Sequence, residues 1–178
     1  MEQETRSSNV KNYLLSALLV IILILLDQVT KAWAVQQLYN RSDIVIIPNV
    51  LQLHYLENTG AAFSLLEQKM MLFYILTPIL VAVMIYFFHK LPKDNPRFRL
   101  IWLILIFLCA GAIGNYIDRI IHSYVIDFIY FSLIDFPIFN VADIYVTCSV
   151  IALFIVVLFY YKEDELDVFF PTKKKRES

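Results

Sequence analysis

Apolar residues form four long runs along the chain, at residues 13–33, 70–89, 99–115 and 144–161. Each run approaches the roughly 20 residues that an α-helix needs to cross the hydrocarbon core of a bilayer. A helix satisfies its own backbone hydrogen bonds, so it is the structure expected for each run in lipid. The pattern predicts an all-α membrane protein with four transmembrane helices.

A different pattern lies between the first two runs. Residues 44–47 and 50–56 are rich in β-branched and aromatic residues and partly alternate, which is typical of short strands. Residues 57–60 have the composition of a turn, and residues 61–66 are expected to return toward the membrane. We therefore predict a small β-sheet subdomain at about residues 42–66. No repeat or linker divides the chain, so we expect one domain over residues 1–178.

The distribution of lysine and arginine predicts the orientation. Eleven of the 15 basic residues fall on one side of a four-span arrangement: Arg6, Lys11, Lys90, Lys93, Arg97, Arg99, Lys162, Lys173, Lys174, Lys175 and Arg176. Basic residues are enriched on the cytoplasmic side of membrane proteins. Both termini are therefore expected in the cytoplasm, with a basic tail over residues 162–178 that is disordered after about residue 172, and the predicted sheet is extracytoplasmic.

Composition supports a membrane protein and argues against several kinds of site. The chain is 60% hydrophobic and 17% charged, which leaves too little polar surface to cover a soluble domain of 178 residues. Cys109 and Cys148 lie within apolar runs, so a disulfide framework is not expected, and no Cys/His cluster has metal-ligand spacing.

The first run has a second interpretation. Lys11, the apolar residues after it and the small pair Ala32 and Ala34 also match a cleaved signal peptide. The polar residues Asp27 and Lys31 close to the supposed cleavage site argue against cleavage. These two residues are four apart, so they share one helix face and are expected to form a structural ion pair.

Several acids follow apolar residues near the outer ends of the third and fourth spans. Asp118 precedes Arg119, so these two charges are expected to neutralise each other or to join the outer interface. Asp127 and Asp143 have no basic neighbour, and ionisable residues at such depth indicate a functional site. Asp135 also lies in an apolar stretch, where it is either a loop acid or an N-cap-like turn former before Pro137.

Two carboxylates at short range share one proton, because two like charges cannot both ionise cheaply in a low dielectric. One then acts as a base on water while the other polarises a carbonyl, as in aspartic proteases. The residues alone do not indicate which acids meet, and structural or ion-conducting roles remain alternatives. A zinc protease is not favoured because His-Glu-x-x-His is absent, the serines lack a nucleophile-elbow pattern, and His54, His89 and His122 are dispersed.

Five motifs occur in order between residues 27 and 143. They are Asp27-Gln-x-x-Lys31, Glu57-Asn58-Thr59-Gly60-Ala61-Ala62-Phe63, Gly114-Asn115-x-x-Asp118-Arg119, Val125-x-Asp127-Phe128 and Phe139-Asn140-x-Ala142-Asp143. Together they resemble the bacterial lipoprotein signal peptidases (signal peptidase II), a family of four-span membrane aspartyl proteases. Ser123 and Ala110 stand where the family usually has glycine, which are small-for-small changes.

The resemblance implies an enzyme that removes the signal peptide from a prolipoprotein, just before a diacylglyceryl-modified cysteine. It implies that Asp127 and Asp143 are the catalytic pair. The residues implied to line or support the substrate site are Asn58, Gly60, Asn115, Arg119, Asn140, Asp27, Lys31 and Asp118.

The resemblance also implies a multi-pass protein of the bacterial plasma membrane with its active site at the extracytoplasmic face. The expected partners are the substrate and membrane lipid, without nucleic acid, and the expected state is a monomer. No metal or organic cofactor is expected, since two acids and a water suffice. The predicted sheet and residues 57–66 would clamp the substrate.

Two other functions compete with this one. A small proton- or cation-coupled transporter would use an acid near the middle of the bilayer, and Asp27 is its natural candidate. A non-catalytic membrane scaffold would account for the aromatic residues but not for the isolated acids.

Overall fold

The computed structural model describes residues 2–60, 70–92, 95–166 and 168–169, and within these the side chains except those of residues 2–9, 70, 163 and 164. The predicted return of residues 61–66 and the tail from residue 170 onward lie outside the described residues. Within them, four helices are long and apolar enough to cross a membrane, which confirms the predicted four-span class.

The four long helices are α1 (Glu2–Leu38), α2 (Met70–Lys90), α3 (Arg99–His122) and α4 (Val141–Phe159). The predicted ends of three helices were wrong, because α1 and α3 continue well past residues 33 and 115, and α4 begins at residue 141 rather than 144. The prediction placed the boundaries of the third and fourth helices at polar residues, Asn115 and Asp143. In the fold those polar residues remain helical because neighbouring elements supply their hydrogen-bond partners.

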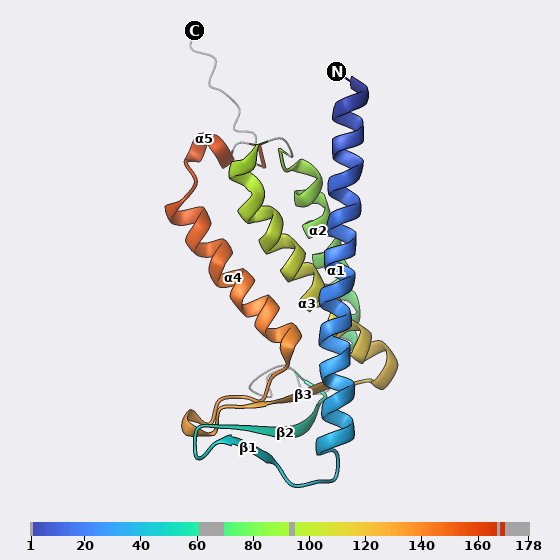
Figure 1. Cartoon of the computed structure of the whole chain (residues 1–178), viewed down its shortest axis with the longest axis vertical. Helices are drawn as coiled ribbons and strands as arrows, with labels where there is room; N and C mark the ends of the chain where they lie inside the picture. The colour runs from blue at the N-terminus through green and yellow to red at the C-terminus, as the bar shows by residue number, and fades with distance from the viewer. Residues whose placement is uncertain (1, 61–69, 93–94, 167, 170–178) are drawn as a thin grey trace.

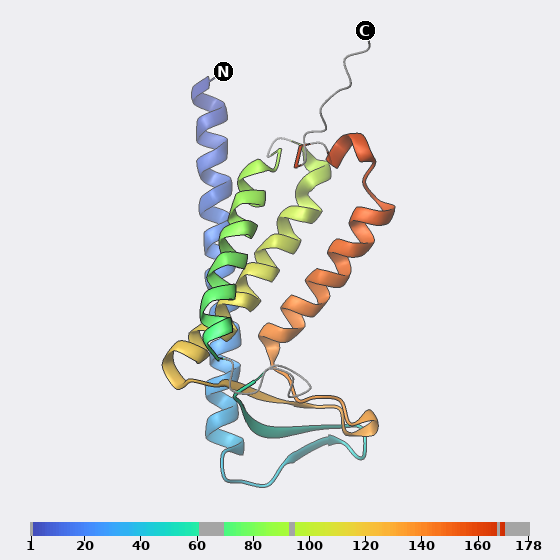
Figure 2. The same cartoon turned by 180° about the vertical axis from the view of Figure 1, so that it is seen from behind.

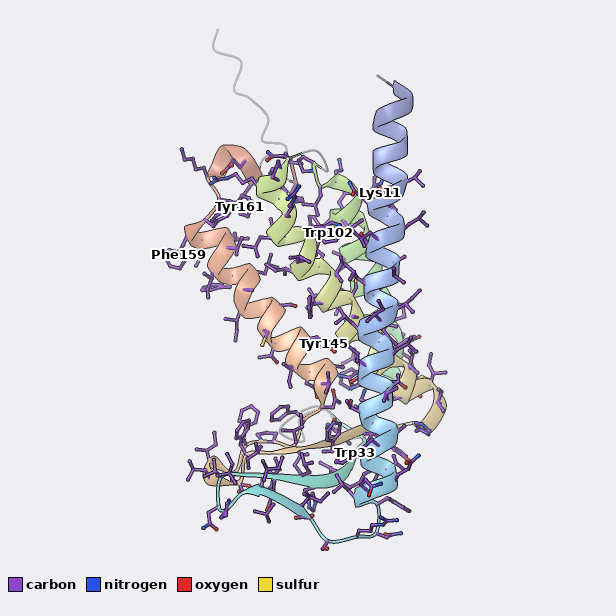
Figure 3. All side chains as sticks on the ribbon, in the orientation of Figure 1. Lys11, Trp33, Trp102, Tyr145, Phe159 and Tyr161 are labelled. Carbon is purple, nitrogen blue, oxygen red and sulfur yellow. The ribbon has the colours of Figure 1, made fainter. Side chains whose placement is uncertain are left out.

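The central helix of the bundle is α3, which packs against α1, α2 and α4. Its apolar stretch is 44% buried, against 6–17% for the other three helices. Glycine permits this close packing, because a Cβ at Gly111 would lie only 2.5 Å from the carbonyl oxygen of Ala142 on α4. Most other apolar side chains point away from the bundle, as Phe159 does in Figure 3, which suits helices surrounded by lipid.

A three-stranded antiparallel sheet with the order β1-β2-β3 lies across one end of the bundle (Figures 1 and 2). Its strands are β1 (Ile44–Ile47), β2 (Leu51–Asn58) and β3 (Val125–Tyr130). The first two strands were predicted, but the turn expected at residues 57–60 begins later, because Glu57 and Asn58 pair with β3. The third strand was missed, since its partner is distant in sequence and it lacks alternation, being buried on both faces at its start.

The opposite end of the bundle contains a short helix, α5 (Glu163–Leu166), in the region predicted as a basic tail. Arg97, in the turn η1 (Pro96–Phe98) that precedes α3, pairs with Glu165 at 2.5 Å. The hydroxyl of Tyr161 donates to the Arg97 carbonyl oxygen at 2.6 Å. These contacts fold the start of the predicted tail back onto α3.

Candidate active site

The N-terminus of α4 fixes the position of Asp143. Asn140 is the N-cap residue, and its Oδ1 accepts a hydrogen bond from the Asp143 backbone N–H at 3.0 Å. Asp143 Oδ2 accepts in return from the Asn140 N–H at 3.1 Å, which completes a capping box. The sequence Asn-x-x-Asp thus starts the helix and orients this carboxylate at the same time.

Asp127 lies on β3 and is 1% exposed. Its Oδ1 accepts from Asn140 Nδ2 at 2.6 Å, and its Oδ2 accepts from Asn58 Nδ2 at 2.7 Å. Asn58 ends β2, and its own Oδ1 accepts from the Gly60 N–H at 3.0 Å. Both oxygens of Asp127 are therefore held by side-chain amides from other elements.

Asn115 on α3 closes the network between the two acids. Its Nδ2 donates to Asp143 Oδ1 at 2.7 Å, and its Oδ1 accepts from Asn140 Nδ2 at 3.0 Å. Asn140 consequently touches Asp127, Asp143 and Asn115. Two carboxylates from different elements are brought into one buried cluster by two asparagines.

Burial raises the pKa of Asp127 to about 7, and the nearby charge of Asp143 acts in the same direction. The amides of Asn58 and Asn140 oppose the increase by hydrogen bonding to the ionised form, and Lys31 opposes it by its charge. The first two effects dominate, so burial and the charge of Asp143 favour the protonated form of Asp127. Such a pair has the chemistry of an acid and a base working together.

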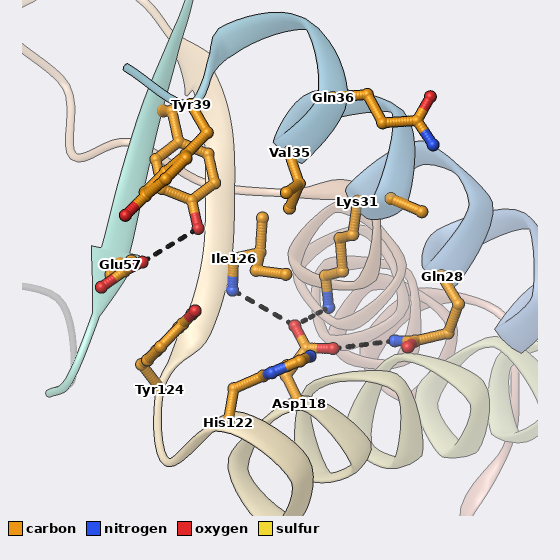
Figure 4. A pocket seen from close by; sticks show the side chains of 12 residues that line it. Gln28, Lys31, Val35, Gln36, Tyr39, Glu57, Asp118, His122, Tyr124 and Ile126 are labelled. Carbon is orange, nitrogen blue, oxygen red and sulfur yellow. Dashed lines mark hydrogen bonds and ion pairs between the residues drawn. The ribbon is translucent and has the colours of Figure 1, made fainter.

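A buried ion cluster lies beside the acids, to which Asn115 links it. Figure 4 shows the pair of Lys31 and Asp118 in this cluster. Lys31 Nζ donates to Asp27 Oδ2 at 2.8 Å, to Asp118 Oδ2 at 2.8 Å and to Asn115 Oδ1 at 2.9 Å, which uses all its N–H groups. The predicted pair of Asp27 with Lys31 is confirmed. The predicted neutralisation of Asp118 by Arg119 is wrong, because adjacent helix residues point in different directions and Asp118 faces Lys31 instead.

Asp27 and Asp118, the acids of the ion cluster, also bind the backbone of the two elements that carry Asp127 and Asp143. Asp27 Oδ1 accepts from the Ala142 N–H at 2.9 Å in the first turn of α4, and Asp118 Oδ2 accepts from the Ile126 N–H at 3.2 Å in β3. Gln28 Nε2 donates to both Asp27 and Asp118. The sequence prediction omitted Gln28 as a site residue, although an amide next to Asp27 in an apolar run was an available signal.

Arg119 extends from α3 to α2, where its guanidinium lies 4.3 Å from the ring centre of Phe73. Its Nη1 donates to the Asn115 carbonyl oxygen at 3.2 Å, and its own carbonyl oxygen accepts from the Tyr74 hydroxyl at 2.7 Å. Phe73 and Tyr74 were not predicted as site residues, since aromatic residues near a helix end carry no specific signal.

The remaining candidates lie elsewhere. Asp135 follows a short 3-10 turn in a left-handed conformation with φ of 48°, and it accepts a hydrogen bond from Tyr130, so it is a loop acid. His54 pairs with Asp43, His89 contacts Tyr13 and His122 stacks on Tyr124. Within the described part of the chain, no group of three or more His, Cys, Asp or Glu side chains is arranged to hold a metal.

A cavity of about 480 Å³ lies next to the ion cluster (Figure 4). Glu57 and Ile126 pair across β2 and β3 and line this cavity. Successive strand residues face opposite sides, so Asn58 and Asp127 lie on the other face. The cavity is therefore behind the acid pair rather than part of it.

Four membrane-crossing helices define an integral membrane protein, and the two buried carboxylates linked by asparagines at one end of the bundle suit the chemistry of an aspartic protease. The family model "Signal peptidase (SPase) II" matches residues 19–159. The chain belongs to the signal peptidase II family, as the motifs predicted.

Individual relatives agree with this assignment. A lipoprotein signal peptidase of Clostridium tetani is 40% identical over 150 residues, covering 83% of this chain and 92% of the relative. One of Streptococcus pneumoniae is 39% identical over 144 residues, covering 80% and 91%. A solved structure, titled as a bacterial membrane enzyme determined in meso at 1.9 Å resolution, superposes with a TM-score of 0.71 at 34% identity, covering 82% of this chain and 94% of that one.

The transporter alternative finds no support. Its candidate residue, Asp27, is fully buried and bound to Lys31, Gln28 and the Ala142 N–H. The acids of the cluster gather at the sheet end of the bundle rather than along a path through it.

Proposed function

We propose that this membrane protease removes the signal peptide of prolipoproteins by using Asp127 and Asp143 as its catalytic pair. The observation that carries the proposal is the double contact of Asn140, which donates to Asp127 and forms the capping box with Asp143. This asparagine keeps two carboxylates from β3 and α4 together at a buried site where they share a proton.

The proposed reaction begins with a water between the two acids. The ionised carboxylate removes a proton from the water, and the resulting hydroxide attacks the carbonyl carbon of the scissile peptide bond. The protonated acid donates to the carbonyl oxygen, which produces a gem-diol. On collapse, one acid takes a diol proton, the other protonates the leaving nitrogen, and the C–N bond breaks. One shared proton then remains on the pair.

The proposed substrate is a prolipoprotein cut just before a diacylglyceryl-modified cysteine. The positive-inside distribution supports both termini in the cytoplasm, which would place the sheet and the acid pair at the extracytoplasmic face. A cysteine anchored there by its lipid would present its peptide bond at the level of the acids. We further propose that residues 1–178 form one domain that acts as a monomer in the bacterial plasma membrane.

In this proposal the neighbouring residues orient the pair and the substrate. Asn58, Asn115 and Asn140 hold the two carboxylates through their amides. Arg119 keeps a positive charge close to the pair. The ion cluster of Asp27, Lys31 and Asp118 supports Asn115, and Gly60 shapes the turn after Asn58.

The test uses purified full-length protein in detergent and a diacylglyceryl-modified prolipoprotein. Asp127→Asn and Asp143→Asn should each abolish cleavage. Asp135→Asn is the matched control, because this acid lies between the two in sequence but outside the cluster, and it should retain wild-type activity. Cleavage by either of the first two variants at the wild-type rate would refute the pair.

A further inference from the structure

An apolar surface lies outside the bundle, in the connection between β3 and α4. Its core is the segment of residues 131–136, here called the tip, which contains a short 3-10 turn (Ser132–Ile134). Leu133 is 66% exposed and Ile134 is 70% exposed, while Phe136 is 46% exposed. Large apolar side chains that are gathered and exposed in this way mark an interaction surface.

The tip has a fixed shape. The Phe136 N–H donates to the Phe131 carbonyl oxygen at 3.1 Å, which closes the loop. The Phe131 ring stacks on Phe139 at 5.8 Å, and Phe136 meets the same ring edge-on at 5.7 Å. Two backbone hydrogen bonds of 2.8 and 3.0 Å join Phe139 to Ile129. These contacts support the tip from behind, so Leu133 and Ile134 project from a structured base.

Helix lengths indicate the level of the tip relative to a bilayer. The 19 residues of α4 form a helix about 28 Å long, which matches a hydrocarbon core of about 30 Å, so α4 begins at the boundary of this core. The span in α1, Val10–Leu38, has 29 residues, about 43 Å, enough to include the headgroup layers. In Figures 1 and 2 the tip, in orange, lies at a level between these two helix ends.

The composition of the chain around the tip suits a position in the headgroup layer. From residue 128 to residue 142 the chain contains a single charged residue, Asp135, whose carboxylate accepts a hydrogen bond from Tyr130. Phenylalanine, leucine and isoleucine presented to the headgroup boundary are typical of interfacial anchors. The apolar surface of the tip thus lies beyond the outer end of α4 but within the length of α1, at the level of the headgroup layer.

We propose that the tip, through Leu133 and Ile134, inserts into the outer interfacial layer of the bilayer and binds lipid directly. The segment joins the strand that carries Asp127 to the helix that carries Asp143. Insertion of the tip therefore sets the depth of both acids relative to the hydrocarbon core. It holds the sheet against the membrane at the end farthest from α1.

The test measures the depth of a nitroxide label on the full chain in lipid nanodiscs. Ile134→Cys is labelled in a background in which Cys109 and Cys148 are replaced by alanine and serine. Val45→Cys, on the outer strand β1 and 56% exposed, is the matched control. The reference for hydrocarbon is a separate variant in which only Cys109 is replaced and native Cys148, which is exposed on α4, carries the label. Accessibility to oxygen, which concentrates in lipid, is compared with accessibility to a water-soluble nickel chelate.

The label at residue 134 should have an oxygen-to-nickel ratio several-fold above that at residue 45 and approaching that at residue 148. Equal ratios at residues 134 and 45 would overturn the proposal. A ratio at residue 134 that increases only after a lipid-modified substrate is added would also overturn it, because the tip would then bind substrate chains rather than the bilayer.

A second arm, which rests on the proposed function, measures cleavage. The double variant Leu133→Asp/Ile134→Asp should cut substrate about tenfold more slowly in proteoliposomes, since removing one such side chain from lipid costs at least that factor. In detergent its rate should equal that of the wild type, and Val45→Asp should be unaffected in both. Equal slowing in detergent and lipid would contradict membrane anchoring, whereas the label experiment remains valid even if the proposed substrate is wrong.

Discussion

Replacing Asn140 by alanine should destabilise the protein and slow catalysis for separable reasons. The side chain caps α4 by accepting from the Asp143 N–H, and loss of a cap costs about 1 kcal/mol. It also donates to Asp127 Oδ1 at 2.6 Å, and loss of a hydrogen bond to a charged group costs about 1.5–3 kcal/mol. Asn115 Oδ1 loses the hydrogen bond from Asn140 but keeps the one from Lys31, so this loss contributes little to the destabilisation. The expected total is about 2.5–4 kcal/mol.

Asn140→Ser separates the two effects. The serine hydroxyl retains the cap but not the amide donor, so this variant should be about 1 kcal/mol more stable than Asn140→Ala. Both variants should lose about 100-fold in kcat, because the acid pair loses the group that aligns it. Denaturant unfolding in detergent gives the stabilities, and cleavage of the modified prolipoprotein gives kcat.

The control is Asn95→Ala, which removes the cap of the short turn η1 at the other end of the bundle. Loss of this N-cap should lower the free energy of unfolding by about 1 kcal/mol without changing kcat. Our reasoning about Asn140 would be refuted if Asn140→Ser cut at the wild-type rate, since the residue would then be a cap and nothing more.

Four further predictions concern the surrounding charges and packing. Lys31→Met should lower the free energy of unfolding by about 3–5 kcal/mol, because two buried carboxylates lose their cation; denaturant unfolding measures this loss. Adding Asp118→Asn should restore part of the lost stability, since it removes one of the two unpaired charges. A double variant no more stable than Lys31→Met would contradict the pairing of Lys31 with Asp118. The pKa of Asp127 is raised from 3.8 to about 7, so the folded state binds its proton more tightly and stability should decrease as pH rises from about 4 to 7; thermal unfolding should show this slope in the wild type and not in Asp127→Asn. The kcat/KM of cleavage should also decrease above about pH 7, where the shared proton leaves, and a flat profile from pH 6 to 9 would argue against proton sharing. Gly114→Ala would put a Cβ 2.7 Å from Asp27 Oδ2, so it should lower stability by about 1–3 kcal/mol in thermal unfolding, and an unchanged melting temperature would show that the ion cluster can move aside.

The hydropathy pattern alone determined the membrane class, the number of spans and the presence of a sheet between the first two. Each of these depends on local composition, because a helix in lipid must be apolar along its own length. The order of the five motifs identified the family. The roles of Asp127 and Asp143 stay a prediction that the experiments above would test.

Only the tertiary structure decided where the helices end and what each polar residue contacts. Asp118 was expected to pair with its neighbour Arg119 but binds Lys31 on another helix, and β3 became a strand because β2 lies beside it. The hydrogen bonds from Asn58 to Asp127 and from Lys31 to Asn115 join residues 69 and 84 positions apart. Local patterns carry no information about such partners, since the free energy of a buried polar group depends on what the packed chain places next to it.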